Sequence, residues 1–93
     1  MGAQGVASLD FGAAPGTDEA FVDVTGQAGF VAASLAEAWV YPIDTATHTA
    51  DEHRVAGLQV DAAYQADGTI RIFGRQVDAD PLDGAWNVGW VWN

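Results

Sequence analysis

The stretch AWNVGWVW, residues 85–92, decides the fold. Side chains of a β-strand point alternately to its two faces, so residues two apart share a face. One face of this stretch carries Trp86, Val88, Trp90 and Trp92. Aromatic residues favour strands, and a face this apolar is more often core or subunit interface than a ligand platform. We therefore predict a strand over residues 85–92 whose tryptophan face is buried in a core or an interface.

The same alternation recurs along the chain and predicts further strands over residues 5–11, 20–24, 54–64 and 69–75. Glycine- and proline-containing turns separate them, and the Ala66-Asp67-Gly68 turn predicts a hairpin between the two strands beside it. Connections this short join antiparallel strands. The predicted fold class is all-β: a compact antiparallel β-sandwich, or a small barrel, of about five to seven short strands with at most one short helix.

The segment of residues 30–39 fits two patterns. Its apolar residues recur near helical spacing, and its alanines favour a helix that ends before Pro42. Residues 35–41 can also be a strand, with Leu35, Glu37, Trp39 and Tyr41 on one face. The pattern by itself supports both interpretations equally.

Composition limits the domain count and the function classes. With 93 residues and 49% apolar content, the chain has the size of one domain, residues 1–93. Three Lys and Arg against 13 Asp and Glu give a net charge of -10, which repels nucleic acid and anionic membranes. Without cysteine, disulfides and thiolate sites are excluded. No apolar run approaches ~18 residues, so we expect neither a signal peptide nor a membrane span.

The densest polar stretch, residues 44–54, holds both histidines of the chain. His48, His53 and Asp51 offer the imidazole and carboxylate ligands that a zinc ion takes. Their spacing matches no metal-site signature, however, and a loop with side-chain caps and an acid paired to Arg54 accounts for the same residues. We therefore predict a structural loop, with no bound metal or other cofactor.

No residue pattern predicts catalysis. The 13 acids nominate many carboxylate pairs, and none of these pairs is distinguished from the others. The serines, Ser8 and Ser34, lie outside any nucleophile-elbow sequence, and the chain has no lysine for a phosphate-binding loop. We predict that the protein is not an enzyme.

Two kinds of side chain are candidates for binding a partner. Tryptophans, including Trp39, can stack on the apolar side of a sugar ring, which makes carbohydrate a candidate ligand. Two of the chain's three cations share a predicted strand face with a phenylalanine, where they pair with acids across strands or dock an acidic partner. The predicted partner or interface residues are Trp86, Trp90, Trp92, Arg71, Arg75 and Phe73.

Five stretches in order resemble a family of small proteins encoded by tailed phages and prophages. They are SLDFGAAPGTD (8–18), VTGQ (24–27), EAWVYP (37–42), HTADEH (48–53) and GAWNVGWVWN (84–93). The resemblance implies a structural protein of the virion, made in the host cytoplasm, with the major capsid protein or other virion proteins as partners. The expected role is capsid decoration (a cement protein), and the alternative is a tail or fibre-associated module. Residues 1–6 are a candidate docking arm.

The chain is also similar, more weakly, to the H-type lectin domain, a trimeric β-sandwich that binds sugars between subunits. The similarity lies in the acidic central loop and in the closing strand with its Trp-Val-Trp ending. It implies a carbohydrate-binding module for host attachment as a further alternative. Together with the exposed strand edges of so small a sandwich, it favours a homo-oligomer, with a trimer preferred.

The charge balance predicts that solubility falls on acidification. The sequence pI is about 4.1, so the net charge approaches zero near that pH and the apolar strand edges lose their electrostatic protection. The soluble fraction after centrifugation, measured from neutral pH down to about pH 4.5, tests this. A solubility that does not change over this range would contradict the prediction.

Overall fold

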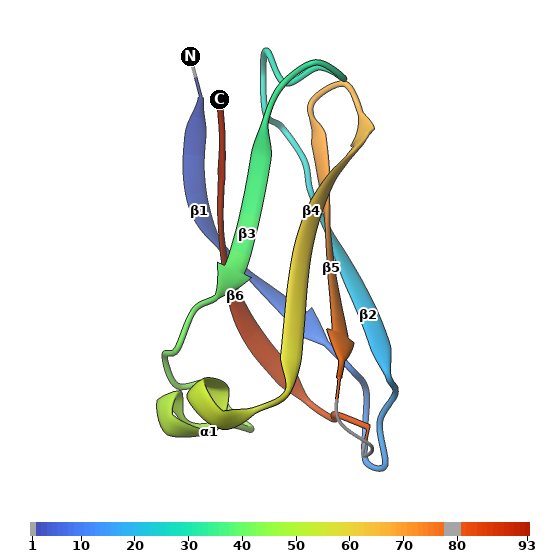
Figure 1. Ribbon diagram of the computed structural model, residues 1–93, viewed down its shortest axis with the longest axis vertical. Helices are drawn as coiled ribbons and strands as arrows, with labels where there is room; N and C mark the ends of the chain where they lie inside the picture. The colour runs from blue at the N-terminus through green and yellow to red at the C-terminus, as the bar shows by residue number, and fades with distance from the viewer. Residues whose placement is uncertain (1, 78–80) are drawn as a thin grey trace.

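The computed structural model describes residues 2–77 and 81–93, which form six strands and one helix (Figure 1). One sheet has the order β1-β6-β3 and the other β2-β5-β4, and all pairings are antiparallel. This confirms the predicted small all-β fold. The elements are β1 (Ala3–Asp10), β2 (Glu19–Val24), β3 (Ala36–Val40), α1 (Ala50–Val55), β4 (Leu58–Ala66), β5 (Thr69–Gln76) and β6 (Ala85–Trp92).

The chain passes from sheet to sheet at nearly every connection. Only β4 and β5 are joined within one sheet, by the predicted hairpin, where Gly68 has a φ of 81° that glycine accepts without strain. The link from β3 to β4 runs through α1, which lies at the end of the sandwich opposite that hairpin turn (Figure 1). The two sheets therefore pack against each other, and each has one face on the core and one face outside.

The core lies between the sheets and is built mainly on β6. None of the inward residues of β6 is more than 7% exposed; they are Trp86, Val88, Trp90 and Trp92. Ile70 and Ile72 of β5 face them from the other sheet and are fully buried. Trp86, Trp90 and Trp92 are therefore core residues of the single chain. Of the two roles predicted for their strand face, core and interface, the structure shows the core, which corrects their assignment as partner-binding residues. Their indoles fit because small residues lie opposite: a Cβ on Gly5, the partner of Trp90 in β1, would be 2.6 Å from the indole.

Two sequence expectations need correction. The strand predicted over residues 54–64 begins only at Leu58, because α1 occupies Ala50–Val55. Thr49 starts that helix with a capping box: its hydroxyl accepts from the Glu52 amide, and the Glu52 carboxylate accepts from the Thr49 amide. The helical alternative for residues 30–39 is also wrong. β3 pairs along β6, and this pairing outweighs the helix propensity of the alanines.

The N-terminal docking arm is largely part of the sheet. From Ala3 onward the chain pairs with β6, beginning with Ala3 opposite Trp92, so residues 3–6 are held by strand hydrogen bonds. Met1 lies outside the described residues. Over the described part of the chain, no helix has the length and apolar character needed to cross a membrane.

The burial pattern predicts unequal effects of two tryptophan substitutions. Trp86 is 3% exposed, and Trp86→Ala should lower the free energy of unfolding by about 3–5 kcal/mol because it leaves a core cavity. Trp39 is 43% exposed on the outer face of its sheet, so Trp39→Ala should cost clearly less. Urea denaturation of both variants measures the difference, and equal losses would contradict the assignment of Trp39 to the surface.

Candidate functional site

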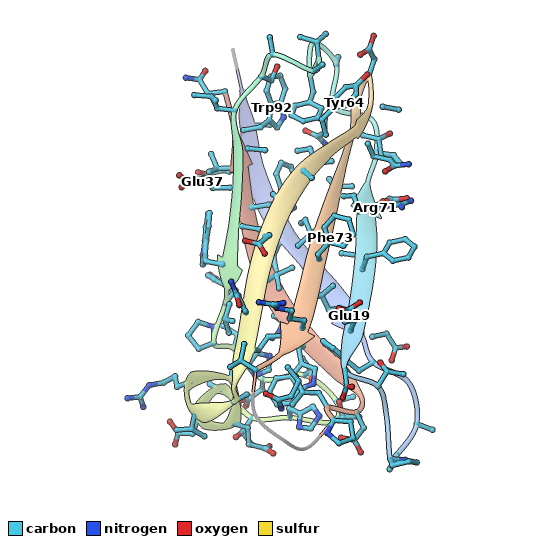
Figure 2. All side chains as sticks on the ribbon, turned by 45° about the vertical axis from the view of Figure 1, so that its right-hand side comes forward. Glu19, Glu37, Tyr64, Arg71, Phe73 and Trp92 are labelled. Carbon is cyan, nitrogen blue, oxygen red and sulfur yellow. The ribbon has the colours of Figure 1, made fainter. Side chains whose placement is uncertain are left out.

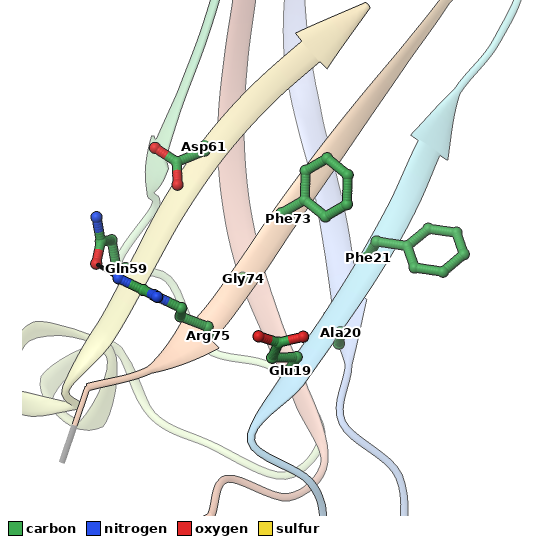
Figure 3. Close-up of a pocket in the computed structure, with 8 residues that line it drawn as sticks. All are labelled: Glu19, Ala20, Phe21, Gln59, Asp61, Phe73, Gly74 and Arg75. Atoms are coloured by element: carbon green, nitrogen blue, oxygen red, sulfur yellow. Dashed lines mark hydrogen bonds between the residues drawn. The ribbon is translucent and has the colours of Figure 1, made fainter. Parts of the chain in front are cut away.

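An open groove of about 570 Å³ crosses the outer face of the β2-β5-β4 sheet (Figure 3). Strand alternation places it there: Ile72 and Gly74 are buried, so Phe73 between them points away from the core. We call it the β5 groove. Its lining residues are Glu19, Ala20 and Phe21 of β2, Gln59 and Asp61 of β4, and Phe73, Gly74 and Arg75 of β5.

Two phenylalanines form the apolar part of the β5 groove. Phe21 and Phe73 are direct partners across β2 and β5, with ring centroids 6.3 Å apart and planes tilted by 49°. They are 55% and 43% exposed, respectively. Paired aromatic rings open to solvent are the kind of anchor that protein interfaces bury, since they supply large apolar area with little conformational freedom to lose.

Arg71 fixes one edge of this pair. Its Nε and Nη2 donate to the two carboxylate oxygens of Asp23 at 2.8 and 3.0 Å, and its Cζ lies 4.1 Å from the centroid of Phe21. The hydrogen bond from Arg71 holds the pKa of Asp23 below its ordinary value, although desolvation opposes the shift. Of the two alternatives for Arg71, pairing across strands is the one seen, and the bidentate pair keeps the guanidinium over the Phe21 ring.

Arg75 supplies the cation of the β5 groove. Its Nη2 donates to Oε1 of Gln59 at 3.0 Å, and Glu19 lies opposite it in the strand register. Among the described residues no carboxylate lies within ion-pair distance of Arg75. The groove therefore offers a guanidinium between two flanking acids, Glu19 and Asp61, beside the phenylalanine pair.

The residues predicted as metal candidates form a packed loop. His53 is 2% exposed; its Nδ1 lies 2.8 Å from the Thr49 carbonyl, and its Nε2 accepts from the Asn87 amide at 2.9 Å. That pattern assigns the proton to Nδ1 and leaves no free lone pair for a metal. Asp51 instead pairs with Arg54 at 3.1 Å. No group of three or more metal-binding side chains occurs in residues 2–77 and 81–93.

Both histidines hold this loop against the beginning of β6, where they contact Trp86. His48 stacks on Trp86 with centroids 3.8 Å apart, and His53 packs against the same indole at 4.9 Å. The Nε2 of His48 lies 2.6 Å from the Asp83 carbonyl, and its Nδ1 lies 3.3 Å from Glu52. The capped loop predicted as the structural alternative is thus what these residues build.

The structure brings together three of the residues predicted for partner binding, Arg71, Phe73 and Arg75, on one outer face. Sequence reasoning missed the residues that complete the groove from the neighbouring strands. For Phe21 a signal existed, because alternation over residues 19–24 places it on the face opposite the buried one. Gln59 and Asp61 could not be assigned to this site without the strand order.

Comparison of the chain with protein-family models, with curated proteins and with solved structures gave no match. The arrangement described above therefore carries the functional argument. The β5 groove has no histidine, serine, threonine or cysteine among its lining residues, and its two carboxylates belong to Glu19 and Asp61. Its combination of exposed rings, one cation and two acids can bind a partner.

The Arg71–Asp23 pair predicts a pH-dependent loss of stability. A carboxyl whose pKa is lowered in the folded state stabilises fully above its ordinary pKa of 3.8 and loses that contribution as the pH falls through the lowered value. Asp23→Asn should therefore lower the melting temperature at neutral pH, and the difference from the parent chain should vanish in strong acid. Asp61→Asn, which removes the same charge from β4, is the control. A difference that persists unchanged in strong acid would contradict the pairing.

Proposed function

We propose that the protein is a non-enzymatic structural protein of a tailed-phage virion, a capsid decoration protein that docks on the assembled capsid through the β5 groove. The observation that carries the docking proposal is the exposed Phe21–Phe73 pair held beside Arg75. The virion assignment is supported by the sequence resemblance that runs through residues 8–93.

The side chains of the β5 groove fit a protein partner. Interface anchors are enriched in aromatic residues and arginine, and the groove presents both within one open surface. The acids beside Arg75 give the surface a pattern of both signs, which selects a partner with the complementary arrangement. With a net charge of -10, the chain disfavours nucleic acid and anionic membranes as alternatives.

The proposed mechanism is linkage. A protein that binds only the assembled capsid lattice shifts the equilibrium toward assembly by the free energy of its own binding. Such binding needs a rigid surface and no moving part, and the β5 groove lies on three paired strands. A homo-oligomer, with a trimer preferred, would repeat this surface around a symmetry axis and match the symmetry of a capsid.

The position in the particle is tested by stoichiometry. A decoration protein should reach roughly one copy for every three major capsid subunits or more, as expected for a symmetric oligomer spread over the lattice. Quantitative mass spectrometry of purified particles with labelled peptide standards measures the ratio. A ratio of a few per cent would favour the tail or fibre-associated module, and absence from the particle would overturn the virion proposal.

Docking through the β5 groove is tested on particles assembled without the chain. Phe73→Ala should weaken rebinding of the purified protein by about tenfold or more, since an aromatic anchor is removed. Val55→Ala is the matched control because Val55 is 83% exposed but lies on α1 and is not among the residues that line the groove. Both variants should keep the melting temperature of the parent chain within a few degrees. Equal binding by the two variants would exclude this groove as the docking surface.

A further inference from the structure

The outer face of the other sheet, β1-β6-β3, carries an exposed tryptophan that lies flat on the strand beside it. Trp39 is the register partner of Gly89. A Cβ on Gly89 would be 2.5 Å from Nε1, 2.5 Å from Cε2 and 2.7 Å from Cζ2 of Trp39. Nearly equal distances to three bonded ring atoms place that position against the face of the indole. One indole face therefore covers buried Gly89, and Trp39 remains 43% exposed.

This packing makes the indole a fixed platform. Any side chain larger than hydrogen at position 89 would push the ring off the sheet, so the glycine reserves its place. Val6 of β1 is the other register partner of Gly89, which gives an apolar row of Val6, Gly89 and Trp39 across the three strands. A ring held in one orientation pays little entropy when a ligand stacks on it.

Hydrogen-bonding side chains flank this apolar row on both sides. One neighbouring row carries Gln4 and Glu37, both register partners of Val91, and Figure 2 shows Glu37 pointing away from the sandwich. The other carries Ser8 and Tyr41, which both pair with Asn87. A small groove of about 230 Å³ runs over this face, lined in part by Gln4, Trp39 and Tyr41. We call this surface the Trp39 platform.

The charge of the Trp39 platform argues against an anionic occupant. The three arginines of the chain lie on α1 and on β5, so the described residues place no arginine on this face, and among them Glu37 is its one ionised side chain apart from the strand ends. An anionic ligand is disfavoured there. A second copy of the chain packed face to face here is disfavoured too, because two Glu37 carboxylates would meet with no cation between them, so a homo-oligomer would use another surface. A neutral pyranose offers an apolar C–H face for the indole and hydroxyls for the flanking amide, hydroxyl and carboxylate groups.

We propose that the Trp39 platform binds a neutral saccharide, with the indole of Trp39 stacked on the apolar face of one pyranose ring and Gln4, Ser8, Glu37 and Tyr41 hydrogen-bonding hydroxyls of that ring and of the sugar units next to it. The site is independent of the β5 groove, which lies on the opposite sheet. If the protein docks on the capsid through the β5 groove, as proposed above, the Trp39 platform faces away from the capsid. It is then open to the polysaccharide of a cell surface.

A glycan array that carries neutral, sialylated and sulfated glycans tests the ligand class with the intact chain. Binding should be confined to neutral glycans, and titration calorimetry with the best of them gives the affinity. Trp39→Ala should lower that affinity at least about tenfold, whereas Trp39→Phe, which keeps a flat ring, should lose much less. Gln4→Ala should weaken binding by a smaller factor because one hydrogen bond is removed.

Phe73→Ala is the matched control, since it removes an exposed aromatic ring from the opposite sheet and should leave glycan affinity unchanged. Near-ultraviolet circular dichroism and sedimentation velocity check that each variant keeps its fold and its oligomeric state. The proposal is overturned if no neutral glycan binds, if only charged glycans bind, if Trp39→Ala and Trp39→Phe bind as the parent does, or if Trp39→Ala changes only self-association. Failure of capsid docking would appear in the Phe73→Ala rebinding assay and leaves these outcomes unaffected.

Discussion

Packing of the β6 indoles against β5 is the interaction on which the rest of this structure depends. β6 is the central strand of one sheet, and its inward side chains fill the space between the sheets. A sandwich of this size has room for such side chains only where their neighbours are small, as Gly5 is beneath Trp90. The indole NH groups at the two ends of the strand are also satisfied: that of Trp86 donates to the Asp83 carbonyl and that of Trp92 to Gln27.

With the inward faces committed to the core, the two outward faces are free to differ, and they do. The β2-β5-β4 face carries Arg71, Arg75 and a phenylalanine pair, whereas the β1-β6-β3 face carries Trp39 among neutral polar groups and one acid. The two partners proposed, a protein surface for the first face and a neutral sugar for the second, follow from this difference in charge and in exposed ring type. The loop built on His48 and His53 serves neither face; it closes one end of the core over Trp86.

The positions of most strands could be predicted from the sequence because a half-buried strand has an apolar residue at every second position. β5 and β6 begin where alternation begins, and the hairpin turn lies at Gly68. The errors have local causes. Alternation from Arg54 onward concealed the end of α1, although the Thr49 and Glu52 capping box was present in the sequence. The helical interpretation of residues 30–39 depended on the alanines of this segment, and pairing of β3 with β6 outweighs their helix propensity.

For the two outer faces, too, the sequence determined some features and the tertiary structure the others. The sequence alone determined the all-β class and placed Arg71, Phe73 and Arg75 on one face, because neighbours on a single strand need no tertiary information to be aligned. Only the tertiary structure decided that Phe21 lies beside Phe73, that Trp86, Trp90 and Trp92 are core and not interface, and that Trp39 rests on Gly89. These contacts join residues from different strands, and the order of strands in a sheet depends on how the whole chain buries its apolar surface, which no local pattern records.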